Sequence, residues 1–264
     1  MRLCGAVVLE VSGSVATVTL SNPGKLNAMS RSMWLELREV FLTLQNDRHV
    51  RCVLLRGEGG HFCAGGDISE YASFRFSTDS LREFHEVEVW GGLQALLDCD
   101  VPIVAQIQGN CMGAGLEIAS CCDLRIATAS AHFGAPIAKL GFPMAPREAA
   151  LVMRAVGDMT AREMLLSAAI LDADNMKQRG FLGSVVGDGE IDVAVQVCID
   201  RICSLAPTAA RLNKQVFRAL APVFHEVFAS ESIANVLSDA YRYADRPEHR
   251  EGVMAFIEKR QPQF

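Results

Sequence analysis

Alternating hydrophobic and polar positions open the chain and predict a β-hairpin. Two alternating runs, residues 6–11 and 15–20, flank the turn residues Ser12-Gly13-Ser14. After Ser30, a suitable N-cap, apolar residues recur at helical spacing and predict a helix over 31–46. The chain therefore begins with two strands and an amphipathic helix.

The same alternation continues through the first half of the chain. Further strands are expected at 50–55, 103–107 and 124–127, with helices at 80–98 and just before Cys122. Residues 68–80 are polar and mixed, and we expect mobility there. Strands that alternate with helices predict an α/β fold with largely parallel pairing.

Helical patterns dominate after about residue 146. We expect helices at 146–156, 160–168, 190–204, 208–220, 224–243 and 248–260. Several of these helices have apolar faces, which favours packing against another chain as well as against their own domain.

Composition and charge argue against nucleic-acid-binding, membrane and secreted proteins. The chain has 264 residues, half of them hydrophobic, and a formal net charge of −6. Without a long basic run it is a poor partner for nucleic acid or an anionic membrane. No apolar run approaches the length of a membrane helix, and the first residues lack the pattern of a secretory signal. We therefore expect a cytoplasmic protein.

The cysteines indicate reduced thiols. Nine are present, and none forms a C-x-x-C motif or stands at zinc-binding spacing with histidine. Most lie in apolar segments, as small core residues do. We expect neither a metal site nor disulfides, which fits a reducing compartment.

Two glycine-containing loops, each directly after a strand, are candidate sites. In the first, residues 61–67, small side chains would let backbone N–H groups approach a ligand carbonyl. The second, residues 109–117, opens a helix whose N-terminal N–H groups suit an anion or a developing oxyanion.

Glu117 follows the second loop in an otherwise apolar helical turn. Burial there would raise the pKa of its carboxyl, as a general acid/base requires. An acid favoured by the helix dipole in a first turn explains the same position equally well. A dinucleotide fingerprint is excluded in practice, since its third glycine would fall at Ile118.

Taken together, these motifs resemble the enoyl-CoA hydratase/isomerase (crotonase) superfamily, over essentially the whole chain. The matching stretches are Asn22-Pro23, Leu26-Asn27-Ala28-Met29, Phe62 to Ile68, Pro102 to Ala105, Gly109 to Glu117, Cys122 to Ala127, Phe133-Gly134, Arg154 to Gly157 and Phe256 to Arg260.

The resemblance implies a crotonase-like spiral of ββα repeats followed by helices that build a trimer. Residues 1–200 would form the core with an acyl-CoA site, and residues 201–264 the C-terminal oligomerisation region. The partners implied are an acyl-CoA thioester and further copies of the chain, as a homotrimer or a dimer of trimers. No cofactor is implied, because coenzyme A enters as part of the substrate.

The resemblance also assigns roles to residues. Glu117 would be the acid/base, and the N–H groups of Ala64 and Ala114 would form an oxyanion hole around the thioester carbonyl. The substrate and CoA would lie near Lys25, Leu26, Ala28, Ala64, Gly66, Asp67, Ile68, Gly113, Pro136, Ile137, Phe256 and Lys259.

One departure from the family pattern bears on the reaction. Hydratases of this family use two glutamates, and the second would stand where this chain has Ile137. Arg147 and Glu148 could reach the site, although a place on the first turn of a helix is favoured for both. His61 and His132 are expected to be structural, as Cys63 and Cys111 are expected to be packing residues.

The expected function is an acyl-CoA enzyme of the hydratase/isomerase type, with a hydro-lyase favoured. A single-acid double-bond isomerase stays open, since one carboxylate can remove a proton and return it elsewhere. Decarboxylation, thioester hydrolysis and non-catalytic acyl-CoA binding stay open as well. A buried carboxyl without a role costs stability, which argues against the last of these.

Overall fold

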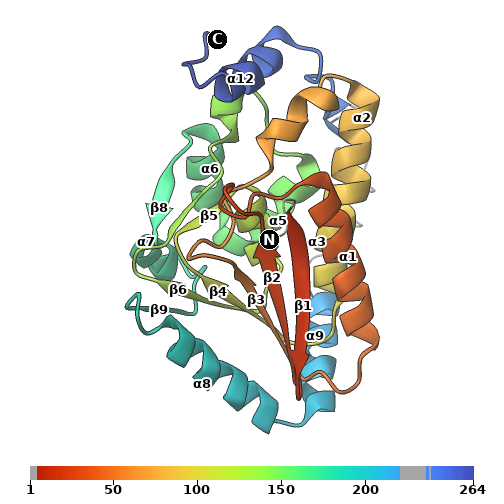
Figure 1. The fold of residues 1–264 in the computed structure, drawn as a ribbon, viewed down its shortest axis with the longest axis vertical. Coiled ribbons are helices and arrows are strands. Elements are labelled where there is room, and N and C mark those ends of the chain that lie inside the picture. The colour runs from red at the N-terminus through yellow and green to blue at the C-terminus, as the bar shows by residue number, and fades with distance from the viewer. Residues whose placement is uncertain (1–4, 221–235, 238) are drawn as a thin grey trace.

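The computed structural model describes residues 5–220, 236–237 and 239–264. A six-stranded sheet in the order β1-β2-β3-β4-β6-β9 runs through the molecule (Figure 1). Its strands are Ala6–Ser12, Val15–Ser21, Cys52–Gly57, Ile103–Ile107, Leu124–Thr128 and Ser184–Val186. Only the β1–β2 hairpin is antiparallel, and the other four pairs are parallel.

The parallel centre of the sheet is covered on both faces. Every residue of β4 is buried, and its Ile103 lies opposite Val53 of β3. Alternate residues of β3 face opposite layers: Val53 packs in the main core, whereas Cys52 packs toward α8 (Ile191–Ser204). Continuous apolar strands are the expected sequence of such a doubly covered sheet.

Helices α1 (Arg31–Asn46) and α3 (Trp90–Asp98) pack together on the face opposite α8 (Figure 1). The Ser30 hydroxyl caps α1 by accepting a hydrogen bond from the N–H of Met33, as the sequence predicts. Between η1 (Ile68–Ser73) and α3 lie α2 (Thr78–Glu83) and a π-helical turn, Phe84–Val89. The expected single helix over 80–98 is thus three consecutive helical pieces.

A second, three-stranded sheet was not predicted. Its strands are β5 (Asn110–Met112), β7 (His132–Gly134) and β8 (Ile170–Asp172). Three residues are too few to give a recognisable alternation of polar and apolar positions. The other elements are α4 (Ala114–Ser120), η3 (Ile137–Leu140), α5 (Pro146–Val156), α6 (Asp158–Leu166) and α7 (Ala173–Gln178).

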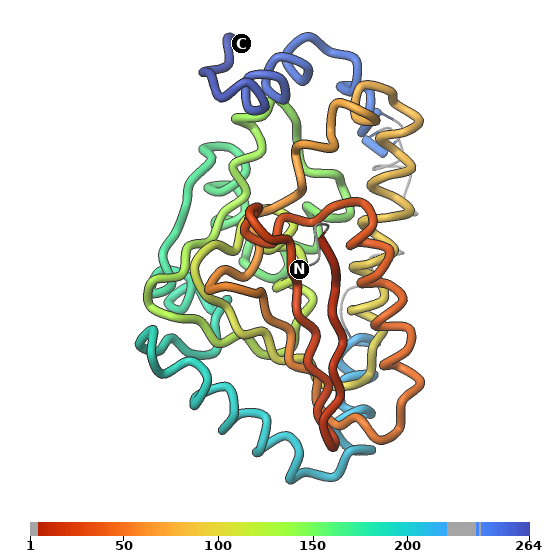
Figure 2. The backbone as a smooth tube through the Cα atoms, viewed as in Figure 1, coloured from red at the N-terminus to blue at the C-terminus, as the bar shows by residue number. Residues whose placement is uncertain are grey.

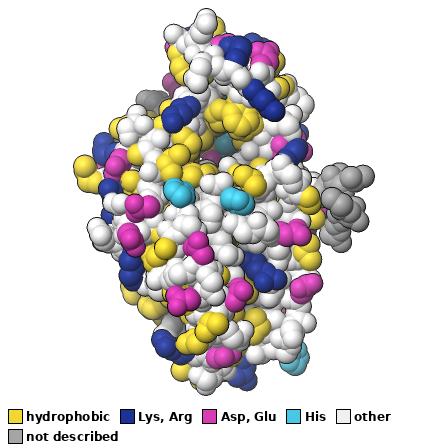
Figure 3. Space-filling view, turned by 60° about the vertical axis from the view of Figure 1, so that its left-hand side comes forward, with side chains coloured by type: hydrophobic (Ala, Val, Ile, Leu, Met, Phe, Trp, Pro, Cys, Tyr) yellow, Lys and Arg dark blue, Asp and Glu magenta, His cyan; other side chains and the backbone are white. Residues whose placement is uncertain are grey.

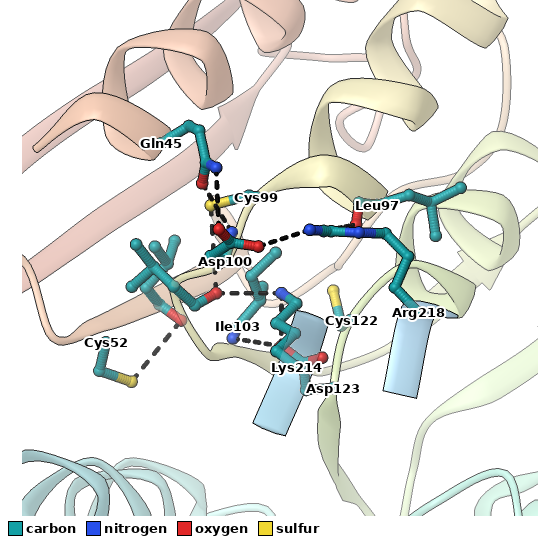
Figure 4. A network of polar contacts seen from close by, with 12 residues as sticks. Gln45, Cys52, Leu97, Cys99, Asp100, Ile103, Cys122, Asp123, Lys214 and Arg218 are labelled. Carbon is teal, nitrogen blue, oxygen red and sulfur yellow. Dashed lines mark hydrogen bonds and ion pairs between the residues drawn. The ribbon is translucent and has the colours of Figure 1, made fainter. Parts of the chain in front are cut away.

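Helix α9 (Pro207–Leu220) is attached to the core by its polar side chains (Figure 4). Lys214 pairs with Asp123 at 2.8 Å and donates to the carbonyl of Val101, and Arg218 pairs with Asp100 at 2.6 Å. The buried residues of α9 are basic, whereas Leu212, Val216, Phe217 and Leu220 are exposed. This is the reverse of the pattern of a helix that covers a core with its apolar face.

Helix α12 (Pro247–Ile257) lies at the same end of the molecule as α2 (Figure 2). It contacts η3 so closely that a methyl group added at Gly252 would come 2.3 Å from the backbone of Leu140. Its His249 is fully buried. The C-terminal helix of this chain therefore closes over the chain's own loops.

The α/β class, the hairpin and most helices are confirmed, with bounds that shift by a few residues. The expected helix at 224–243 lies largely outside the described residues. Segment 68–80, where the sequence leads us to expect mobility, contains η1 and the start of α2, and its Tyr71, Phe74 and Arg75 are buried. In the described part of the chain no single helix meets the length and hydropathy of a membrane span. Helices α8 and α9 do so only as a pair bent by 102°.

Candidate active site

The two glycine loops predicted from the sequence lie side by side. The N–H of Cys63 donates to the carbonyl of Asn110 at 2.8 Å, and the N–H of Met112 donates to the carbonyl of Cys63 at 2.9 Å. A side chain at Gly115 would approach the Cys63 carbonyl to 2.6 Å, so a glycine is required for this contact. The loops are thus fixed to each other by backbone hydrogen bonds and close packing.

A third segment, Leu26-Asn27, supports the first loop in an unusual conformation. Both residues have positive φ, 48° and 60°. The Asn27 side chain holds them: its amide donates to the carbonyls of Glu58 and His61, both at 2.8 Å. The carbonyl of Leu26 then accepts the N–H of Ala64 at 3.0 Å.

This last hydrogen bond bears on the oxyanion hole that the family resemblance implies, in which the N–H of Ala64 is one donor. Because the N–H of Ala64 donates to Leu26, it is not available for a thioester oxygen. The N–H of Gly66, two residues on, has no hydrogen-bond acceptor among the described residues, and neither does the N–H of Ala114 at the start of α4. Both residues line one cavity. The available backbone donors are therefore those of Gly66 and Ala114.

The cavity encloses about 320 Å³ and is mostly apolar. Hydrophobic side chains, with Lys and Arg beside them, gather on the upper part of the face shown in Figure 3. Of the residues predicted to contact substrate, those on the cavity wall are Ala64, Gly66, Ile68, Gly113, Ala114, Glu117, Pro136, Ile137 and Phe256. Lys25, Leu26, Ala28, Asp67 and Lys259 lie off this wall. Lys25 instead pairs with Asp67 at 2.7 Å.

Glu117 projects from α4 into the cavity wall and is buried. Burial raises the pKa of its carboxyl well above the usual range, the nearby Glu148 raises it further, and the positive charge of Arg75 opposes both effects. A carboxyl that keeps its proton near neutral pH can act as a general acid.

Glu148 is the second acidic group on the wall, and it comes from the first turn of α5. The favoured position on a helix turn is confirmed, and the side chain also reaches the site. Its exposed fraction is 3%, and burial raises the pKa of its carboxyl to about 8. Glu117 and Glu148 thus supply two carboxyls to one apolar cavity, although the resemblance would place the second glutamate at Ile137.

His85, from the π-helical turn, orients Glu148. Its Nδ1 lies 2.7 Å from Oε1 of Glu148, and its Nε2 lies 3.3 Å from Nη1 of Arg75. A guanidinium can only donate, so Nε2 accepts and the ring proton sits on Nδ1, where it donates to Glu148. Burial first, and then Arg75, lower the pKa of His85 well below its usual value, so the ring is neutral.

The remaining residues of interest behave as structural groups. Nδ1 of His61 accepts the N–H of Asn110 at 3.2 Å, and His132 is exposed and off the cavity wall. Cys63 and Cys111 are fully buried, and burial raises the pKa of the Cys63 thiol to about 12. Both thiols are therefore protonated packing groups, as predicted.

Tyr71, Arg75 and His85 line the cavity but were not predicted from the sequence. The sequence did hold an indication of these residues, namely buried-type aromatic residues at short intervals around them. Segment 68–80 resembles a loop in its polarity but contains the aromatic residues Tyr71 and Phe74. His85 follows Phe84 directly, and both side chains are buried. Polar residues that stand among regularly spaced apolar residues are therefore candidates for a functional site.

Comparison with known proteins identifies the enzyme family to which the chain belongs. The model of the enoyl-CoA hydratase/isomerase family matches residues 10–264. The chain belongs to that family, and it is an enzyme that processes acyl-CoA.

Particular relatives agree with this placement. A short-chain-enoyl-CoA hydratase of Clostridium acetobutylicum is 33% identical over 258 residues, which cover 96% of this chain and 95% of that protein. A crystal structure of an enoyl-CoA hydratase/carnithine racemase from Magnetospirillum magneticum is 36% identical with a TM-score of 0.79, covering 100% and 96%. Methylmalonyl-CoA decarboxylase, solved in complex with 2-nitronate-propionyl-CoA, is 25% identical with a TM-score of 0.85, covering 98% and 97%. The fold is the crotonase fold.

Proposed function

We propose that this enzyme hydrates the double bond of a 2-enoyl-CoA, with Glu117 and Glu148 as its two acid/base groups. The observation that carries this proposal is the presence of both carboxyls on the wall of the cavity that the Gly66 and Ala114 N–H groups also line. Hydration needs one group to remove a proton from water and one to protonate the α-carbon.

The environments of the two carboxyls indicate which one is the base and which one is the acid. The Nδ1–H of His85 donates to the Glu148 carboxyl, and the positive charge of Arg75 favours its ionised form, whereas burial and the neighbouring Glu148 both raise the pKa of Glu117. Glu148 is therefore the base and Glu117 the acid. Water adds its oxygen to the β-carbon and gives a proton to Glu148, while Glu117 gives its proton to the α-carbon. A proton transfer from Glu148 to Glu117 restores the starting state.

Charge develops on the thioester oxygen as the β-carbon is attacked. Two N–H donors directed at that oxygen, from Gly66 and Ala114, would each stabilise it by about 3–4 kcal/mol. The apolar cavity strengthens these hydrogen bonds because it excludes water. The backbone thus stabilises the enolate-like state, and the two glutamates move the protons.

The test of this proposal is incubation with crotonyl-CoA in D₂O, followed by enoyl absorbance and by mass spectrometry. We expect loss of the enoyl absorbance and addition of one water to the product. Deuterium at the α- or γ-carbon without water addition would indicate the single-acid isomerase instead. An unchanged substrate across a panel of chain lengths would contradict both reactions.

We also propose that the exposed apolar stripe of α9 mediates a homotrimer or a dimer of trimers. Leu212, Val216 and Leu220 recur every four residues and, with Phe217, are exposed in the single chain. Replacing Val216 and Phe217 by aspartate would bury charge in such an interface. Light scattering should then shift from three or six times the chain mass of 28.7 kDa to a single chain. The control Thr208→Asp, on the same helix, should stay assembled. A wild-type monomer would refute this proposal.

A further inference from the structure

A buried guanidinium forms part of the cavity wall. Arg75 is 1% exposed and lies over the faces of Tyr71 and Phe142, with its Cζ 4.5 and 4.1 Å from the two ring centroids. Aromatic faces stabilise a cation that has lost its water. They do not neutralise it.

The hydrogen-bond partners of Arg75 are neutral. Its Nε donates to His249 at 3.5 Å, its Nη1 to His85 at 3.3 Å and its Nη2 to Tyr243 at 3.3 Å. The pKa of His249 is lowered to about 4 by burial, and the neutral form of His85 follows from its lowered pKa. No carboxylate of the described chain pairs with Arg75 within 4 Å.

Arg75 also has donors to spare. A guanidinium carries five N–H groups, and the three contacts above use three of them. The two that remain, one on each terminal nitrogen, have no acceptor within hydrogen-bond distance in the described part of the chain. Glu117 and Glu148 also line the cavity, but neither forms an ion pair with Arg75. A buried cation that no carboxylate pairs with is costly unless a ligand supplies the anion.

We infer that the acyl group of the substrate carries a carboxylate of its own, which pairs with Arg75. This inference rests on the proposed function and names its substrate class: a 2-enoyl-CoA whose chain ends in a carboxylate. Such a group would accept hydrogen bonds from the spare N–H groups, and guanidinium–carboxylate pairs are strong, charge-assisted interactions. The other cation on the wall, Lys139, is exposed and keeps its water.

The test measures binding of saturated acyl-CoAs, which the enzyme cannot hydrate. Calorimetry would compare glutaryl-, adipyl- and suberyl-CoA with the monoacyl-CoAs of equal length. At one length we expect the diacid to bind about 10- to 100-fold more tightly, the range of a charge-assisted hydrogen-bonded pair. Arg75→Met should weaken the binding of diacids far more than that of monoacyl-CoAs, and so abolish this preference. Arg75→Lys should keep part of it, and the matched control Lys139→Met should keep all of it.

Each other outcome has a distinct meaning. Monoacyl-CoAs bound as tightly as diacids at every length would overturn the inference and leave the proposed function standing. An equal loss of both ligands in Arg75→Met, in a variant whose melting curve shows it folded, would reduce Arg75 to a support for His85. If no acyl-CoA bound to the wild type, the proposed function itself would fail. The wild-type comparison holds even if Arg75→Met does not fold.

Discussion

Replacing Glu148 by glutamine should lower kcat for the hydration of a 2-enoyl-CoA by about 10²- to 10⁴-fold, the usual contribution of one general acid/base. Glutamine has nearly the shape of glutamate and can still accept the hydrogen bond from Nδ1 of His85, but it cannot remove a proton from water. Stopped-flow or steady-state assays of enoyl absorbance would measure the change.

Two controls separate this result from a general loss of structure. The affinity for a saturated acyl-CoA should stay within about threefold of the wild type, because Glu148 acts on water and not on the CoA portion. The variant Glu83→Gln removes an exposed acid that lies off the cavity wall and should be fully active. Unchanged kcat in Glu148→Gln would show that this carboxyl has no part in the reaction.

The position of Ile137 offers a complementary test of the same idea. Its side chain lies on the cavity wall, at the position where the family resemblance would place a second glutamate. Adding Ile137→Glu to the Glu148→Gln variant should restore part of the lost rate, because a carboxyl again faces the cavity. A double variant as slow as the single one would show that only the position of Glu148, beside His85, can serve.

Replacing Glu117 by glutamine should reduce kcat by a similar factor of about 10²–10⁴. In the proposed mechanism this carboxyl provides the proton for the α-carbon, and the isosteric amide cannot donate one as an acid. The doubly substituted enzyme, Glu117→Gln with Glu148→Gln, should be only slightly slower than either single variant, since the two groups act as a unit. Full activity of Glu117→Gln on a true substrate would contradict the account.

The same substitution should stabilise the fold at high pH. Burial raises the pKa of Glu117 in the folded state, so the folded chain binds this proton more tightly than the unfolded chain. The contribution of Glu117 to the unfolding free energy then falls as pH rises above the unfolded value, by up to about 1.4 kcal/mol per pH unit. Glutamine lacks this dependence. The Tm of Glu117→Gln relative to the wild type should therefore increase between pH 5 and pH 8.

Elements whose sequence carries a full periodic pattern could be predicted. The hairpin, α1 and the strand that becomes β4 each have enough residues to show an alternation or a helical stripe. The strands of the small sheet have three residues each, and their position depends on pairing between distant segments. Such pairing leaves no local pattern, which is why this sheet was missed.

The site was predictable where its chemistry lies in one local motif. The loop before α4 indicated Glu117 by its own pattern, and the family resemblance added Ala114; both lie in the first turn of one helix. The rest of the candidate site comes from three segments that are separated in the sequence and contribute Arg75, His85 and Glu148. Whether Ala64 or Gly66 offers its N–H depends on a single hydrogen bond to Leu26, which sequence spacing does not reveal.

The central claim is that Glu148 is the base, and that it acts in the cavity it shares with Glu117. The measurement that tests it most directly is the pH dependence of kcat/KM for wild type and Glu148→Gln with the same enoyl-CoA. Glu148 must lose its proton to act, so the wild-type rate should rise with pH up to about 8, the pKa to which burial raises this carboxyl. The much slower variant should lack that rise. A wild-type profile without the rise, or the same rise in both enzymes, would contradict the account.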